Sequence, residues 1–214
     1  MIEYRTIKTT GTHEIIIKKS RFICNIKHVE TEEEAEDFIN QIKKEHYKAT
    51  HNCVAYQIGE KNEIQRALDN GEPSGTAGIP MLEALKHMEL QNVVAVVTRY
   101  FGGIKLGAGG LIRAYSNAVS EAVHEIGVIE RTIQHPVSVT VDYAFTGPMD
   151  NWIANHPYTL LDTTYLEKVT YTLGVPKKDV ETFQQTLTDF TNGQAQFEVA
   201  DARYVDIPVS PDPE

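Results

Sequence analysis

The spacing of apolar residues near the N-terminus predicts a β-hairpin. Residues 12–17 and 20–29 alternate apolar with polar side chains, which is the period of a strand with one buried face. The alternating apolar residues are Ile15, Ile17, Phe22, Cys24 and Ile26. We expect the two strands to pair with each other.

A helix is predicted from Thr31 to about Tyr47. The Thr31 side chain can cap the first turn while Glu34 reaches back to it, and apolar residues then follow at helical spacing. Those apolar residues are Ala35, Phe38, Ile39 and Ile42. Two further strands are predicted over residues 51–58 and 63–68.

The clearest element is the run Val93–Val97. A continuous β-branched run is typical of a strand covered on both faces, so we expect it at the centre of the first domain's sheet. Residues 77–88 carry apolar side chains on one helical face, and a second helix is predicted from the glycine-rich loop through Ile126. Gly127 is placed to end that helix.

The pattern restarts near Ile133 and predicts a second domain. Its elements follow the order strand, helix, strand, strand, helix, strand, which is the ferredoxin-like arrangement. The expected segments are 137–143, 145–155, 159–165, 168–175, 177–190 and 196–205. We therefore expect an α+β protein with domains over 1–134 and 135–208, followed by an acidic, proline-rich tail over 209–214.

Charge is distributed unevenly between the two predicted domains. The formal net charge is −10. Residues 1–134 hold 16 Lys and Arg against 18 Asp and Glu, whereas residues 135–214 hold 4 against 12. Since phosphate neutralisation supplies most nucleic-acid affinity, any nucleic-acid surface must be a local patch in the first half.

Several classes of protein do not fit the composition. No run of about 18 apolar residues is present, and the N-terminus lacks the pattern of a secretory signal, so we expect a cytoplasmic protein without a membrane contact. Cys24 and Cys53 are too few for a disulfide framework or a zinc site. The scattered histidines form no metal-ligand motif, and we expect neither a metal nor a cofactor.

A glycine-rich loop leads into the helix that ends at Ile126. Glycines allow close approach of the backbone, and the first N–H groups of a helix attract anions. The glycines are Gly102, Gly103, Gly107, Gly109 and Gly110, with Arg99, Lys105 and Arg113 as neighbouring cations and Tyr100 and Phe101 as rings that could stack on a base. The spacing matches neither the Walker nor the dinucleotide motif, so the alternatives are an anion site and a tight structural turn.

A second glycine-rich loop, residues 69–78, also precedes a helix. It carries the carboxylates of Asp69 and Glu72 and the hydroxyls of Ser74 and Thr76. Ser74 or Thr76 could bind a phosphate or could cap the helix. If the two loops converge at one edge of the sheet, they would supply backbone donors, cations and a carboxylate to a phosphate ester.

His51 and Cys53 lie two residues apart and therefore point to the same face of a strand. With Glu72 they could form a catalytic triad. A buried structural thiol is the commoner role for a cysteine in an apolar strand. The single tryptophan, Trp152, is expected to pack in the second domain's core.

Three ordered motifs resemble the IMPACT/YigZ family. They are residues 51–56, residues 69–82 and residues 96–115. The family often has Asp-Asp-Gly where this chain has Asp69-Asn70-Gly71, so a mechanism that needs paired carboxylates there is weakened.

The resemblance implies a fold for each domain and a role connected with translation. It implies a first domain like domain 2 of ribosomal protein S5 and a second domain like the last, ferredoxin-like domain of elongation factor G. Eukaryotic members regulate translation through protein binding, interfering with activation of a starvation-sensing kinase that bacteria lack.

Two hypotheses about function follow. The first is a non-enzymatic, translation-linked regulator that binds RNA, the ribosome or a regulatory protein through the glycine-rich site, with Arg99, Lys105 and Arg113 on phosphates. The second is an enzyme acting on a small phosphorylated or nucleotide substrate, with Glu72 as acid or base. Folding alone could also account for the glycines.

Overall fold

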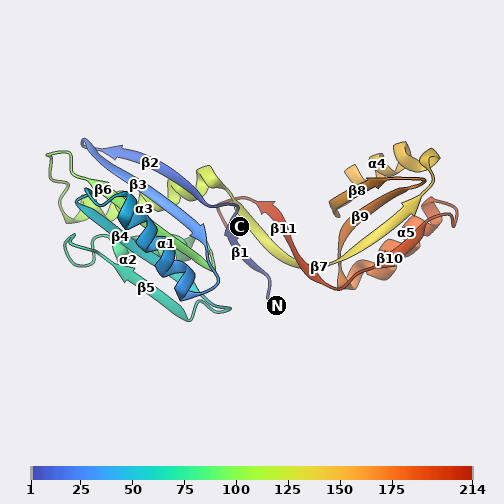
Figure 1. Cartoon of the computed structure of the whole chain (residues 1–214), viewed down its shortest axis with the longest axis horizontal. Coiled ribbons are helices and arrows are strands. Elements are labelled where there is room, and N and C mark those ends of the chain that lie inside the picture. The colour runs from blue at the N-terminus through green and yellow to red at the C-terminus, as the bar shows by residue number, and fades with distance from the viewer. Residues whose placement is uncertain (1, 214) are drawn as a thin grey trace. The chain divides into compact units, whose positions relative to one another are not determined.

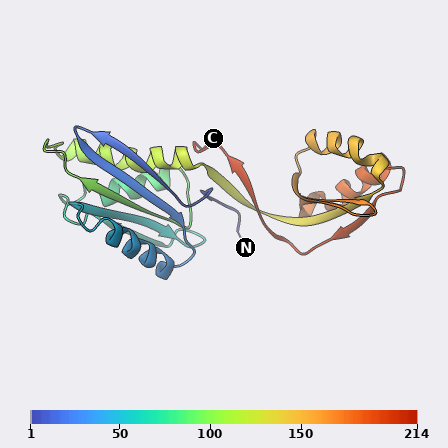
Figure 2. The same ribbon diagram turned by 45° about the horizontal axis from the view of Figure 1, so that its top comes forward.

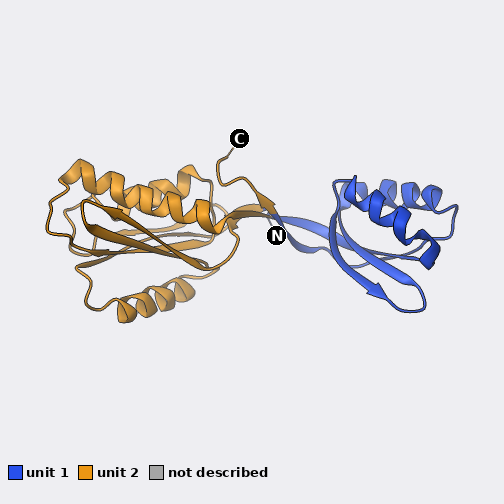
Figure 3. Ribbon diagram, turned by 90° about the horizontal axis from the view of Figure 1, so that it is seen from above, with its two compact units in different colours: residues 1–3, 131–207 blue, residues 4–130, 208–214 orange. Residues whose placement is uncertain are grey.

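The structure is a computed structural model that describes residues 2–213, and the chain divides into two compact units (Figure 3). The N-terminal unit comprises residues 4–130 with the segment from Pro208 onward. The C-terminal unit comprises residues 131–207 with the residues before Tyr4. Both units contain strands and helices, which confirms the expected α+β class.

An antiparallel five-stranded sheet forms the framework of the N-terminal unit (Figure 1). Its strands are β2 (Gly11–Ile17), β3 (Ser20–His28), β4 (His51–Ile58), β5 (Ile64–Leu68) and β6 (Val93–Tyr100). They lie in the order β2-β3-β6-β4-β5. The predicted hairpin is present, and β6 occupies the predicted central position.

Helices cover both faces of this sheet (Figure 2). Val94 and Val96 of β6 pack with the apolar residues of α1 (Glu32–Glu45). Val93, Ala95 and Val97 face the other way, toward α2 (Gly78–His87) and α3 (Ala108–Ile126). All five residues of the run are completely buried, which is why it lacks polar alternation.

The predicted helix caps are partly realised. Thr31 Oγ1 accepts a hydrogen bond from the Glu34 N–H at the start of α1, at 3.2 Å. The Glu34 carboxylate reaches back to the N–H of Glu30 rather than to that of Thr31, at 2.7 Å. Gly127 ends α3 with φ of 86°, a conformation that favours glycine.

The C-terminal unit repeats the expected order of elements. They are β7 (Val128–Val141), α4 (Thr146–Ala154), β8 (Thr159–Tyr165), β9 (Val169–Pro176), α5 (Val180–Phe190) and β10 (Gln196–Val199), followed by β11 (Arg203–Val209). Short 3-10 turns precede α4 and α5. Trp152 is buried and packs edge-on to Phe183 with ring centroids 5.9 Å apart, as expected of a core residue.

Four strands differ from the sequence prediction. β1 (Tyr4–Ile7) is absent from it, β7 begins nine residues before Val137, β6 continues to Tyr100, and the final strand is divided into β10 and β11. The early part of β7 mixes buried Val128 and Ile129 with polar residues and lacks strand alternation. Backbone pairing, such as His135 opposite Val175 in β9, needs no apolar alternation.

The segment after β11 lies against the N-terminal unit. Arg5 Nη2 donates to the carbonyl oxygens of Ser210 and Pro211, at 2.8 and 3.1 Å. Asp212 Oδ1 lies 3.3 Å from His124 Nε2. These contacts connect the expected acidic tail to the start of β1 and to α3.

Gly102 provides a test of the packing that supports the first glycine-rich loop. A Cβ at this position would overlap the backbone of Lys19 and Ser20, whereas a Cβ at Gly147 in α4 would meet nothing within 4 Å. We expect Gly102→Ala to lower the free energy of unfolding by about 1–3 kcal/mol because backbone must move. Gly147→Ala should raise it by up to about 1 kcal/mol. Urea unfolding measures both, and an unchanged stability of Gly102→Ala would contradict this packing.

Candidate functional site

A cavity of about 410 Å³ lies between the two glycine-rich loops of the N-terminal unit. The loops therefore converge, as a shared site requires. The lining residues are His51, Glu72, Pro73, Arg99, Phe101, Lys105, Leu106, Gly107, Ala108 and Leu111. We call this cavity the pocket.

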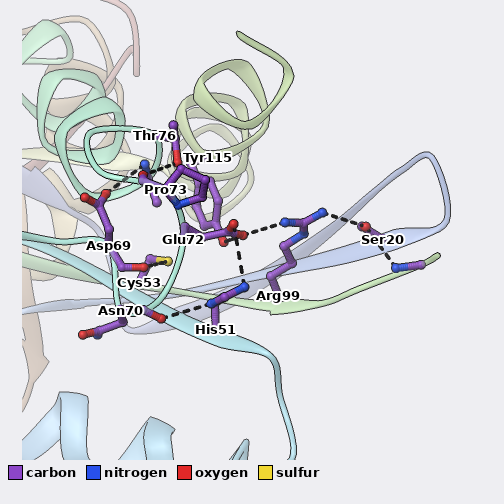
Figure 4. Close-up of polar contacts among 12 residues, drawn as sticks. Ser20, His51, Cys53, Asp69, Asn70, Glu72, Pro73, Thr76, Arg99 and Tyr115 are labelled. Carbon is purple, nitrogen blue, oxygen red and sulfur yellow. Dashed lines mark hydrogen bonds and ion pairs between the residues drawn. The ribbon is translucent and has the colours of Figure 1, made fainter. Parts of the chain in front are cut away.

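Strand register places two of the polar residues side by side. His51 at the start of β4 is the direct partner of Arg99 near the end of β6, so both side chains lie on one face of the sheet. Glu72 approaches from the loop after β5, and Tyr115 approaches from α3. Figure 4 shows His51, Arg99 and Tyr115 converging on the Glu72 carboxylate.

The centre of the site is a buried ion pair. Arg99 Nη1 lies 2.7 Å from Glu72 Oε1, and the Tyr115 hydroxyl donates to the same oxygen at 2.8 Å. The Glu72 and Arg99 side chains are only 3% and 6% exposed. Removing one partner of such a pair typically costs about 3–5 kcal/mol, since a buried charge is left unpaired. The charge of Arg99 is therefore neutralised by Glu72 inside the protein.

The rest of the Arg99 guanidinium is enclosed by aromatic rings. Its Cζ lies 5.4 Å from the Phe22 ring centre and 5.5 Å from that of Phe101. Nη2 reaches Ser20 Oγ at 3.4 Å, and Ser20 Oγ also accepts from the Gly102 N–H at 3.1 Å. Nε is buried and has no hydrogen-bond partner among residues 2–213.

His51 faces the second oxygen of Glu72. Its Nδ1 lies 3.1 Å from the Asn70 carbonyl oxygen, and its Nε2 lies 3.7 Å from Glu72 Oε2. A carbonyl only accepts, so this bond places a proton on Nδ1. In the neutral ring, Nε2 then presents its lone pair to a carboxylate oxygen. Two acceptors thus face each other beside the pocket.

Cys53 lies in an environment that keeps its thiol protonated. Burial raises the pKa of Cys53 to about 12, and Sγ donates to the Asp69 carbonyl oxygen at 3.0 Å. A nucleophilic cysteine requires the thiolate. Burial also raises the pKa of the Tyr115 hydroxyl, which therefore acts as a donor to Glu72.

The cap of α2 comes from Asp69, not from Ser74 or Thr76 as anticipated. The Asp69 carboxylate accepts from the N–H groups of Gly75, Ala77 and Gly78 at 2.8–3.1 Å. Thr76 instead donates to the Pro73 carbonyl oxygen at 2.6 Å, and Ser74 is exposed. These two hydroxyls contribute no side-chain cap to α2.

Helix α3 begins without such a cap. Gly107 precedes it with φ of 73°, which favours glycine, and supplies no side chain. The first turn carries no acidic residue, and both Gly107 and Ala108 line the pocket. The free N–H groups at the start of α3 therefore give the pocket rim a partial positive charge.

The aromatic residues of the loop have different exposures. Tyr100 is partly buried, with its hydroxyl 2.9 Å from His46 Nδ1 and Arg21 over its ring. Phe101 is 49% exposed and lines the pocket. Phe101 is therefore the ring with a free surface.

Four exposed cations lie in or beside the first glycine-rich loop. Lys105 lines the pocket, Arg113 lies beside Gly109, and Lys18 and Lys19 form the β2–β3 turn against Gly102. None of the four makes an ion pair within the described part of the chain. We call these four residues the basic rim. Lys18 and Lys19 were not predicted, because they are distant in sequence from both loops.

The remaining glycines of the first loop differ in conformation and in the space around them. Gly103 has φ of 83° and open space, Gly109 is exposed, and a Cβ at Gly110 would lie 3.0 Å from Leu106 Cβ. Across residues 2–213, no cluster of three or more potential ligands could hold a metal ion. No helix in this range is long and apolar enough to span a membrane.

Comparison with known proteins identifies the family. Residues 18–123 match the Impact N-terminal domain, and residues 139–194 match a domain of unknown function (DUF1949). IMPACT family member YvyE of Bacillus subtilis is 49% identical over 203 residues, covering 95% of this chain and 94% of YvyE. This chain belongs to the IMPACT family.

Two further comparisons extend over most of this IMPACT-family chain. IMPACT family member YigZ of Escherichia coli is 34% identical over 182 residues, covering 84% of this chain and 89% of YigZ. A crystal structure of a hypothetical protein is 31% identical, with a TM-score of 0.59 over 92% of this chain and 97% of that one. Every pocket residue lies inside the Impact N-terminal match.

The Asp69 cap predicts a pH dependence of stability. Burial alone would raise the pKa of Asp69, but the three N–H donors outweigh it, and the pKa lies below its ordinary value. A lowered native pKa stabilises the fold above the unfolded-state pKa of about 4, and that stabilisation is lost as pH falls further. We expect Asp69→Asn to cost about 1 kcal/mol at pH 7 and progressively less below pH 4.

Urea unfolding at pH 7 and at acid pH measures this difference. Asp37→Asn, an exposed carboxylate of α1, is the matched control and should behave as wild type at neutral pH. A cost of Asp69→Asn that is the same at every pH would contradict the assigned charge of the cap.

Proposed function

We propose that this IMPACT-family protein is a translation-linked regulator that binds RNA, on the ribosome, through the basic rim at the first glycine-rich loop. The link to translation is supported by the resemblance of its motifs to eukaryotic members that regulate translation. The positive charge and the exposure of the rim residues support RNA as the partner that this protein contacts.

The rim is the observation on which this proposal rests. Its four cations are exposed and unpaired among the described residues, and two of them, Lys105 and Arg113, lie just before and within the start of the uncapped helix α3. Helix N-termini and cationic side chains both bind phosphate. Phe101, exposed beside them, offers a ring on which an unpaired base can stack.

The second unit is a poor candidate for the phosphate contact. Residues 131–207, which make up most of this C-terminal unit, hold 5 Lys and Arg against 10 Asp and Glu. Strong acidity opposes phosphate binding, so the RNA contact belongs to the N-terminal unit. Within that unit, Arg99 has a supporting role, because it holds Glu72 in place rather than facing solvent.

Retention on bacterial ribosomes and total RNA tests this function. We expect wild-type retention at low salt and its loss as salt is raised. Lys105→Ala with Arg113→Ala should weaken retention and lower the salt slope by about 0.7 for each phosphate of a single strand that is no longer neutralised. Arg99 is left intact because its removal would destabilise the fold.

The matched control removes two exposed cations elsewhere, Lys44→Ala with Lys61→Ala. Lys44 lies on α1, and Lys61 lies in the turn at the far end of β4 from His51. This control has the same net charge as the rim variant. Equal retention of the two variants, or salt-independent retention, would count against an RNA contact and favour a protein partner.

A second candidate function is an enzyme acting on a small phosphorylated or nucleotide substrate. It is favoured by one observation, that Glu72 and Lys105 line the same cavity. In this mechanism Lys105 holds the phosphate, and Glu72 Oε2, which lies 3.7 Å from His51 Nε2, is the acid or base. Glu72 Oε1 is already occupied by two donors.

Phosphate release distinguishes the enzyme from the binding protein. Under the favoured function, nucleoside monophosphates incubated with stoichiometric protein are recovered intact, and phosphorus NMR shows no new signal. Conversion of a nucleoside monophosphate by the wild-type protein, and its loss in the single variant Glu72→Gln, which keeps His51 and Tyr115, would instead establish the enzyme.

A further inference from the structure

The pocket offers three kinds of contact at different places. Glu72 and His51 present acceptors, Phe101 and Leu111 present apolar surface, and Lys105 with the start of α3 presents positive charge. The volume of about 410 Å³ falls within the usual range of small-molecule sites. A matching ligand has a hydrogen-bond donor, a flat apolar body and an anionic group.

The acceptor end is the most specific of the three. Glu72 Oε2 and His51 Nε2 are 3.7 Å apart, too far for a hydrogen bond, and with the imidazole in its neutral form both can accept from one donor placed between them. An amino group has two hydrogens and can donate to both. A carbonyl at that position would oppose two acceptors at once.

The apolar wall fits a planar ring. Phe101 has Arg99 over one face and leaves about half of its surface free. Leu111 is buried on α3, and Pro73 is exposed on the opposite loop. A flat ring between these residues would stack on Phe101 and exclude water from the Glu72 carboxylate.

The mouth of the pocket fits a phosphate. The backbone N–H groups that begin α3 have no side-chain cap, in contrast to those of α2, which Asp69 occupies. Lys105, which is exposed and makes no ion pair among residues 2–213, lines the same pocket as Gly107 and Ala108 at the start of α3. The mouth of the pocket thus offers a cation and uncapped N–H groups to an anion.

We infer that the pocket binds a single unstacked nucleotide carrying an amino group. Its phosphate lies at Lys105 and the start of α3, its base stacks on Phe101, and its amino group donates to Glu72 Oε2 and His51 Nε2. This deepens the proposed function where the nucleotide belongs to an RNA strand. A free nucleoside monophosphate has the same chemistry.

Recognition of an amino group would make the pocket selective among bases. Adenine and cytosine carry an amino group on the base edge, whereas hypoxanthine and uracil carry a carbonyl at the same position. Adenosine and inosine monophosphates are therefore a matched pair, as are the cytidine and uridine monophosphates. We expect the amino member of each pair to bind about tenfold more tightly.

Titration calorimetry of the full-length protein with these four monophosphates tests the inference. Wild-type protein suffices for the comparison, so no variant has to fold. Phe101→Ala, at an exposed position, should weaken adenosine monophosphate binding about tenfold through lost stacking. Equal affinity within both pairs, or no binding of any monophosphate and no effect of Phe101→Ala on RNA binding, would overturn the inference.

Single-stranded RNA distinguishes the two sources of the nucleotide. Oligoadenylate that outcompetes its own monophosphate, and loses this advantage in Lys18→Ala with Lys19→Ala, indicates a nucleotide within a strand. Monophosphates that bind selectively while RNA does not would retain the pocket assignment and refute the proposed function. RNA binding that depends on the rim but does not change with base identity or with Phe101→Ala would support the proposed function and refute the pocket assignment.

Discussion

The buried ion pair between Glu72 and Arg99 determines the geometry of the site. It joins a loop to the central strand of the sheet, and Tyr115 extends the connection to α3. Because each charge would be strongly destabilising alone, the loop over residues 69–78 has one favourable position relative to β6. That position encloses the pocket between the two glycine-rich loops and directs Glu72 Oε2 toward His51.

Rigid packing reinforces this position on both sides. Asp69 binds three N–H groups within its own loop and at the start of α2. On the other side, Gly102 lies directly against the β2–β3 turn, where a side chain would overlap backbone. The site is therefore built on secondary-structure elements whose ends are fixed, which is what a selective pocket requires.

Local patterns were informative where burial and periodicity coincide. Val93–Val97 revealed the central strand because both faces of the sheet are covered, and Thr31 revealed the start of α1. β1 and the first half of β7 could not be predicted in this way, because backbone pairing holds strands there whose sequences show no regular alternation. The two loops were recognisable from glycine content, but the pairing of Glu72 with Arg99 was not, since 27 residues separate them. Spacing likewise gave no sign that Lys18 and Lys19 meet the loop at Gly102.

The contrast between the buried cluster of Glu72, Arg99 and Tyr115 and the exposed basic rim has an evolutionary consequence. Glu72, Arg99 and Tyr115 come from three different elements and depend on one another, so a change at one of them must be matched at the others to keep the fold. Lys18, Lys19, Lys105 and Arg113 are exposed and can change singly at little cost in stability. Affinity for a partner can therefore change among relatives through substitutions in the rim, while Glu72, Arg99 and Tyr115 are inherited together.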